Sequence, residues 1–318
     1  MNHLENLRSK IKGPVFSIVT PFREKDDEID FDALEKYINY AYEAGARIFY
    51  VMAYNSRFSE LSWEEIKVLN TFVTKTVKGI DSNCIMITAD PLHCSTEVSV
   101  EFARHSELIG ADLISLIFRE KVYSDDQVYN HFKKINDSTG IGILIHEMKL
   151  ISGYGDFSYN WPVESLDRLV DLSNVIAIKE DAKEDDFTRN VINTIKDRAS
   201  IVLAGGGKSQ WLRFADDGCQ AYLNGIGVFE PKLAIRFREH YLNGNTDAYM
   251  RIVNEIEAPF FAETVKKFGW HLTIKAAMEA RGHMSRYERM PLQALDDEKA
   301  NIVASVLDKL PIDELSEK

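Results

Sequence analysis

Short apolar runs alternate with longer amphipathic stretches along the first 244 residues of the chain. The short runs are rich in β-branched residues and carry few polar positions, which is typical of buried strands. The longer stretches repeat their apolar positions at helical spacing, and one opens on a capping pattern, Ser62 followed by Glu65. The predicted strands are 14–22, 48–54, 84–89, 112–118, 141–147, 175–179, 200–204 and 221–226.

A helical pattern follows each of these eight strands. Strands alternating with amphipathic helices indicate a parallel sheet covered by helices, and eight units are the number that closes a (β/α)8 TIM barrel. The alternative is an open, doubly wound sheet, but that fold carries a Gly-x-Gly-x-x-Gly turn after an early strand. Here the only glycine cluster, at 205–207, comes late. We therefore predict an α/β protein built on a TIM barrel.

The strand pattern stops after Gly244. Further helices are predicted over 247–268, 271–280 and 296–310. Pro259 is expected to kink or split the first of them, because proline lacks the amide hydrogen that a helix needs. We predict two domains: a barrel over 1–230, whose eighth helix follows to about 244, and a C-terminal helical domain over 245–318.

The composition excludes several classes of partner. A net charge of −12 argues against a surface for nucleic acid or for an anionic membrane. No apolar run approaches the roughly 20 residues of a membrane-spanning helix, and the N-terminal residues lack the apolar region of a signal peptide. The three cysteines form no ligand pattern, and neither do His93, His146 and Glu147. We expect a cytoplasmic protein without metal, cofactor, nucleic acid or membrane partner.

One predicted strand ends in a lysine that could act as a catalytic nucleophile. The apolar run from 175 to 178 leads directly into Lys179. Burial disfavours the charged form of a lysine, and an uncharged amine near neutral pH is what imine formation with a carbonyl substrate requires. The plainer alternative is a structural lysine that pairs with Glu180 or Asp181 at the strand mouth.

The barrel hypothesis brings other strand ends toward Lys179. His146 ends the neighbouring strand and could move protons near pH 7, although a histidine bonded to a backbone carbonyl is an alternative. Glu147 should face the opposite way, because side chains alternate along a strand. Arg119 could hold a carboxylate, and Glu120 could act as an acid or bind a cation, unless both are structural ion-pair partners. The other candidates for substrate binding are Tyr54, Asn55, Gly205 and Asn224.

Short motifs in a fixed order extend over nearly the whole chain. They stand at 19–22, 29–30, 61–65, 95–97, 110–112, 178–180, 231, 274–277 and 289–292. In these motifs the chain resembles the dihydrodipicolinate synthase / N-acetylneuraminate lyase family of Schiff-base-forming enzymes. The resemblance implies a (β/α)8 barrel with a helical C-terminal domain, assembled as a dimer or tetramer. It also implies that Lys179 forms an imine with pyruvate or another 2-oxo acid.

Other motifs of that family are replaced. After its second strand the family carries Gly-Thr-Thr-Gly-Glu, whose first threonines hold the substrate carboxylate and relay protons, whereas this chain has Ala-Tyr-Asn-Ser-Arg at 53–57. The family's tyrosine acid/base corresponds to His146. The arginine that binds the second substrate falls on Ile151, and an aromatic pair falls on Arg119 and Glu120. We therefore do not expect dihydrodipicolinate synthesis itself.

The first hypothesis is a Schiff-base-forming lyase, either an aldolase or a hydro-lyase, that acts on a 2-oxo acid derived from a sugar acid. Lys179 would attack the carbonyl group and His146 would carry protons, so activity should fall in mild acid. The second hypothesis is a non-catalytic ligand-binding or regulatory protein on the same scaffold. The third is an imine-independent enzyme in which His146, Glu120 and Glu147 do the acid/base work.

Overall fold

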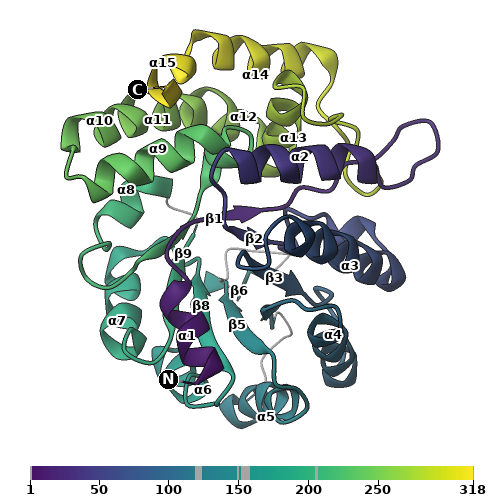
Figure 1. The fold of residues 1–318 in the computed structure, drawn as a ribbon, viewed down its shortest axis with the longest axis vertical. Helices are drawn as coiled ribbons and strands as arrows, with labels where there is room; N and C mark the ends of the chain where they lie inside the picture. The colour runs from purple at the N-terminus through teal and green to yellow at the C-terminus, as the bar shows by residue number, and fades with distance from the viewer. Residues whose placement is uncertain (1, 119–123, 149, 152–157, 205–206, 318) are drawn as a thin grey trace. The chain divides into compact units, whose positions relative to one another are not determined.

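The computed structural model describes residues 2–118, 124–148, 150–151, 158–204 and 207–317. Eight strands of the described chain close into a parallel barrel in the order β1-β10-β9-β8-β5-β4-β3-β2, which confirms the predicted TIM barrel (Figure 1). The barrel strands are β1 (Gly13–Ser17), β2 (Ile48–Tyr50), β3 (Ile85–Ala89), β4 (Leu113–Leu116), β5 (Gly142–Glu147), β8 (Val175–Glu180), β9 (Ser200–Leu203) and β10 (Ala221–Leu223).

Helices alternate with these strands. They are α2 (Phe31–Glu43), α3 (Trp63–Ile80), α4 (Thr96–Leu108), α5 (Asp125–Asn136), α6 (Val163–Leu169), α7 (Asp185–Ile195), α8 (Gly207–Leu212) and α9 (Pro231–Leu242). Local capping residues mark where these helices begin. Ser62 and Glu65 form the predicted capping box of α3, in which each side chain accepts a hydrogen bond from the other residue's backbone amide. Asp30 caps α2 by accepting from the amide of Ala33.

Several elements differ from the sequence prediction at their ends. The strand expected over 14–22 stops at Ser17, and the one expected over 48–54 stops at Tyr50. Apolar residues continue beyond each strand because the loops that follow are themselves buried. The sequence analysis did not predict the first helix or a short antiparallel pair of strands. These are α1 (His3–Lys10), β6 (Leu150–Ile151) and β7 (Ser158–Tyr159).

The C-terminal region is helical, as predicted. It contains α10 (Thr246–Arg251), α11 (Ala258–Phe260), α12 (Lys266–Phe268), α13 (Trp270–Ala280), α14 (Asp297–Lys309) and α15 (Ile312–Glu317). Pro259 divides the first predicted helix without ending it: it lies in α11, between the π-helical segments Ile252–Glu257 and Phe261–Val265. Wider turns on either side accommodate a residue that cannot donate a hydrogen bond.

The described chain forms two compact units. The first comprises Met1–Val15, Ile48–Ala53 and Leu61–Leu223, and its strands are surrounded by helices α3 to α7 (Figure 1). The second comprises Phe16–Arg47, Tyr54–Glu60 and Asn224–Lys318, and so includes α2 and all helices from α9 onward. The domain boundary at residue 245 stays a prediction. No described helix is long and apolar enough to cross a membrane.

Candidate functional site

Lys179 lies beside two other chemically active side chains at the end of β8. It is 1% exposed, and its Nζ atom lies 2.6 Å from Nε2 of His146 and 2.8 Å from Oδ2 of Asp181. The His146 side chain is 2% exposed, and its Nε2 lies 3.7 Å from the same carboxylate oxygen. An amine, an imidazole and a carboxylate therefore meet around one nitrogen atom in the first unit.

The strand register explains why these groups meet. Strands β5 and β8 are parallel neighbours, and His146 is paired directly with Lys179. Because side chains alternate along a strand, both point to the same face, and Asp181 returns to that face two residues after Lys179. From the sequence alone, Asp181 is expected only as a structural ion-pair partner of Lys179. Alternation along the strand is the signal that could have placed Asp181 beside Lys179. Because β8 ends at Glu180, however, alternation alone does not fix the direction of the Asp181 side chain.

The charges in this cluster are set by competing effects. Burial alone would raise the pKa of Asp181, but the charge of Lys179, the nearby imidazole of His146 and the hydrogen bond from Lys179 outweigh it and hold that pKa well below its usual range. Asp181 is therefore ionised, and one positive charge is stabilised beside it. If Lys179 carries this charge, Nε2 of His146 is left as the acceptor, so the imidazole is neutral with its proton on Nδ1.

Two further carboxyl groups lie behind the cluster. Glu147 and Glu180 are paired in the register, one residue beyond His146 and Lys179, and both are 0% exposed. Burial, and then the charge of Glu180, raises the pKa of Glu147 to about 7. Glu147 faces away from His146, as the sequence analysis expected: it accepts from the amides of Trp161 (3.3 Å) and Asp181 (3.4 Å).

The other predicted site residues have different surroundings. In the second unit, the Asn55 amide donates to Oγ of Ser17 (2.7 Å) and accepts from Nε1 of Trp270 (3.2 Å). Asn55 is thus engaged at both ends of its side chain. The Tyr54 ring lies 6.3 Å from the His271 ring. Asn224 is buried and immediately precedes a short 3₁₀ turn. Arg119, Glu120 and Gly205 lie outside the described residues.

A buried charge cluster that the sequence analysis missed fixes the segment carrying Tyr54 and Asn55. Arg57 has a positive φ of 61°, and its guanidinium donates twice to Oε1 of Glu288, at 2.7 and 2.9 Å. It also donates to the backbone carbonyls of Asn55 (3.1 Å) and His271 (2.8 Å). Lys275 lies 3.7 Å from Glu288, and burial lowers the pKa of Lys275 to about 8. No pattern in the sequence links these distant positions, because only the tertiary structure brings them together.

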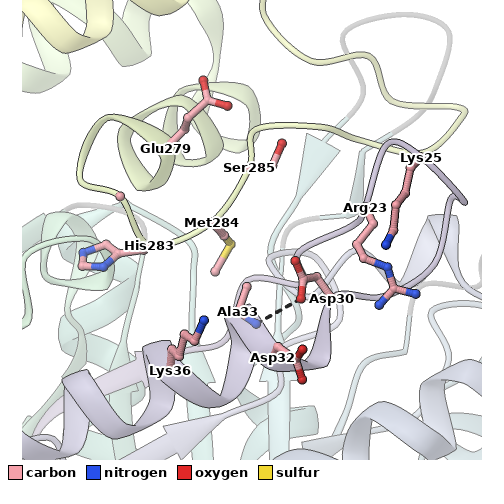
Figure 2. Close-up of a pocket in the computed structure, with 11 residues that line it drawn as sticks. Arg23, Lys25, Asp30, Asp32, Ala33, Lys36, Glu279, His283, Met284 and Ser285 are labelled. Carbon is pink, nitrogen blue, oxygen red and sulfur yellow. Dashed lines mark hydrogen bonds between the residues drawn. The ribbon is translucent and has the colours of Figure 1, made fainter.

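A surface hollow of about 640 Å³ in the second unit carries many charges but none of the predicted site residues (Figure 2). Its lining includes Arg23, Lys36, Asp30 and Glu279. The two acids already serve the fold, because Asp30 caps α2 and Glu279 pairs with Arg286. Among the described residues, no group of three or more histidines, cysteines or acids is arranged to hold a metal ion. The Lys179 cluster is therefore the candidate site.

The fold and this cluster define a (β/α)8-barrel protein with a buried, partnered lysine at the end of its sixth barrel strand. The profile of the Dihydrodipicolinate synthetase family matches residues 10–310, and the chain belongs to that family. The expected family and an enzyme of the aldolase or lyase type are thereby confirmed.

Individual relatives are distant. The chain is 27% identical over 308 residues to a 4-hydroxy-tetrahydrodipicolinate synthase of Clostridium novyi, covering 93% of this chain and 96% of the relative. It is 27% identical over 219 residues to a probable 5-dehydro-4-deoxyglucarate dehydratase of Chelativorans, covering 67% and 69%. Among solved structures, YagE, a prophage protein of Escherichia coli in complex with pyruvate, superposes with a TM-score of 0.82 at 18% identity, covering 95% and 99%.

Replacing Glu147 with glutamine should change how stability depends on pH. The folded-state pKa of Glu147, about 7, exceeds its ordinary value of 4.5, so its contribution is present below pH 4.5 and is lost as the pH rises through 7. Glutamine does not titrate. The stability of Glu147→Gln relative to wild type should therefore rise between pH 4.5 and 8, by up to about 3 kcal/mol. Urea unfolding across this range measures it, and a flat difference, like that expected for exposed Glu43→Gln, would contradict the assignment.

Removing the acid at the centre of the Arg57 cluster should destabilise the second unit. Glu288→Gln removes the acid nearest to the buried Arg57 and Lys275 and leaves only Glu60, 3.9 Å from Arg57, among the described acids beside them. This change should cost about 3 kcal/mol of unfolding free energy. The exposed pair of Glu263 with Lys267 provides the control, since Glu263→Gln should cost less than about 1 kcal/mol. Equal effects of the two changes in denaturant unfolding would show that the Arg57 cluster contributes no more than a surface ion pair.

Proposed function

We propose that the protein is a Schiff-base-forming lyase in which Lys179 attacks the carbonyl carbon of a 2-oxo acid. The observation that carries the proposal is the 2.6 Å approach of the buried Lys179 amine to Nε2 of His146. An ammonium group cannot attack a carbonyl carbon, so the amine must first lose a proton. His146 lies within hydrogen-bond reach to accept that proton and to return it later.

The same two groups supply the later steps. After attack, the carbonyl oxygen must leave as water, and this requires a proton that the imidazolium of His146 can donate. The protonated imine then withdraws electrons from the neighbouring carbon atoms. That withdrawal permits either cleavage of a carbon–carbon bond or loss of a hydroxyl group as water, so one imine supports both an aldolase and a hydro-lyase.

The names of the relatives support this range of reactions. They include a synthase and a probable dehydratase of a sugar-acid derivative, and the E. coli structure contains pyruvate. We infer a 2-oxo acid derived from a sugar acid as the substrate. Dihydrodipicolinate synthesis is disfavoured because Tyr54 and Asn55 stand where the family carries its threonines, and Ile151 stands in place of its arginine.

Substrate contacts belong to the proposal as well. Tyr54, Asn55 and Arg119 are proposed to hold the anionic or hydroxylated end of the substrate. The remaining proposed contacts are Glu120, Gly205 and Asn224. Because both ends of the Asn55 amide already have partners, its contribution would be limited to the one donor and one acceptor position left on it. Assembly as a dimer or tetramer and a cytoplasmic location stay predictions.

A second candidate function rests on the 2.8 Å ion pair between Lys179 and Asp181. This pair also fits a lysine that is structural, in a protein that binds its ligand non-covalently or works by acid/base chemistry alone. Covalent capture of the substrate separates the two candidates.

Borohydride should trap a carbonyl compound on Lys179. The protein is incubated with pyruvate and a panel of sugar-derived 2-oxo acids, reduced, and weighed intact. We expect the mass of a reduced imine, mapped by peptide analysis to Lys179. Lys179→Ala should give no adduct, whereas exposed Lys183→Ala should behave as wild type. Trapping that persists in Lys179→Ala, or no trapping by wild type with any acid, would contradict the proposal.

The rate of imine formation should fall in acid. Once both Lys179 and His146 hold a proton, no base remains to free the amine, so the rate should drop as the pH decreases. His146→Gln should lower the rate at pH 7 by about 10²- to 10⁴-fold, the usual contribution of a general acid or base. The pH dependence of borohydride trapping tests both expectations. A rate that stays constant from pH 5 to 8 would exclude His146 as the proton carrier.

A further inference from the structure

We propose that Asp181 is a further catalytic residue, the fixed counter-ion of the reacting nitrogen before and after the imine forms. The inference rests on the proposed function, because it assigns a role within imine formation. It concerns a residue that the sequence analysis treated only as a structural partner of Lys179.

The first support is that one oxygen atom reaches both basic nitrogens. Oδ2 of Asp181 lies 2.8 Å from Nζ of Lys179 and 3.7 Å from Nε2 of His146. The two nitrogens are themselves 2.6 Å apart. A proton can therefore move between amine and imidazole while the positive charge stays within ion-pair distance of the same carboxylate. Since the amine and the imidazole are almost fully buried, the carboxylate rather than water stabilises this positive charge.

The second support is the charge balance of the reaction. The reactive state holds a neutral amine on Lys179 and an imidazolium on His146. The amine attacks the carbonyl carbon and a carbon–nitrogen bond forms. The carbon–oxygen bond then breaks, and the oxygen leaves as water with one proton from the imidazolium and one from the amine. The nitrogen keeps its last proton as an iminium. One positive charge exists before and after, and it moves from His146 to the nitrogen that Asp181 contacts.

The third support is the way the backbone around Asp181 is held. The amide of Asp181 donates to Oε2 of Glu147 at 3.4 Å, and the amide of Ala182 donates to Oε1 of Glu180 at 2.6 Å. Glu180 in turn accepts from the hydroxyl of Thr188 in α7 at 2.7 Å. Two buried carboxyl groups on the outward face thus fix the turn that directs Asp181 inward. We assign Glu147 and Glu180 as positioning residues.

The charge of Asp181 affects several buried groups around it. Besides Lys179 and His146, the described groups that interact electrostatically with Asp181 include Glu147, Glu180 and Tyr50. Burial raises the pKa of each of these three, and the charge of Asp181 raises it further. Asp181 already supplies the negative charge that the iminium needs. A carboxylate on the substrate would therefore require a cation of its own.

Two assays on Asp181→Asn test this role, because the change keeps the shape and removes the charge. The first measures the rate of borohydride trapping with pyruvate, which should fall at least tenfold because the iminium has lost its counter-ion. The second measures trace acetylation of Lys179 by acetic anhydride as a function of pH, read by peptide mass. Its midpoint should move to lower pH, because the ammonium form has lost the same counter-ion. A merely structural role would not make imine formation slower and the amine easier to deprotonate together.

Variants at Asp181 and at an exposed aspartate serve as controls. Asp181→Glu should recover part of the trapping rate, and exposed Asp186→Asn should match wild type in both assays. Trapping within twofold of wild type by Asp181→Asn, with an unchanged acetylation midpoint, would overturn the proposal. So would failure of both Asp181→Asn and Asp181→Ser to fold, since the carboxylate would then be structural. Absence of any adduct in wild type would instead refute the proposed function, while the acetylation assay would still test the coupling of Asp181 to Lys179.

Discussion

The need to compensate one positive charge in a buried place governs the chemistry of this barrel. Lys179 is almost fully buried, and desolvation of an ammonium group costs several kcal/mol unless an anion lies beside it. Asp181 provides that anion at 2.8 Å, and His146 provides an alternative position for the proton at 2.6 Å. Asp181 therefore allows the charged lysine to be buried in the folded barrel, and His146 allows the lysine to give up its proton.

The barrel makes this arrangement possible through its register. Pairing of His146 with Lys179 places two side chains from separate strands on one face, and pairing of Glu147 with Glu180 places two more on the other. The inward layer carries the reactive groups, and the outward layer holds the turn that follows β8. In barrels of this class the C-terminal ends of the strands carry the active site. The second unit has its own buried ion cluster around Arg57, which fixes the segment carrying Tyr54 and Asn55.

Much of the fold could be predicted from the sequence because the patterns that specify strands and helices are local. Eight apolar runs separated by amphipathic stretches specified the barrel, and capping residues such as Ser62 marked helix starts. Strand ends were less accessible: β2 stops at Tyr50, although buried residues continue beyond it. Within the candidate site, the barrel prediction placed Lys179 and His146 together, because they end neighbouring strands. Asp181 was expected only as a structural partner of Lys179 because it lies one residue past β8, and the pairing of Arg57 with Glu288 was missed because only tertiary structure joins them.

A crystal structure of the protein soaked with pyruvate would test the central claim most directly. The account predicts continuous electron density between Nζ of Lys179 and the carbonyl carbon of the acid, with Asp181 still beside that nitrogen. Pyruvate bound elsewhere, or bound near Lys179 without a covalent link while the ion pair with Asp181 stays intact, would show that the lysine is structural and would contradict the account.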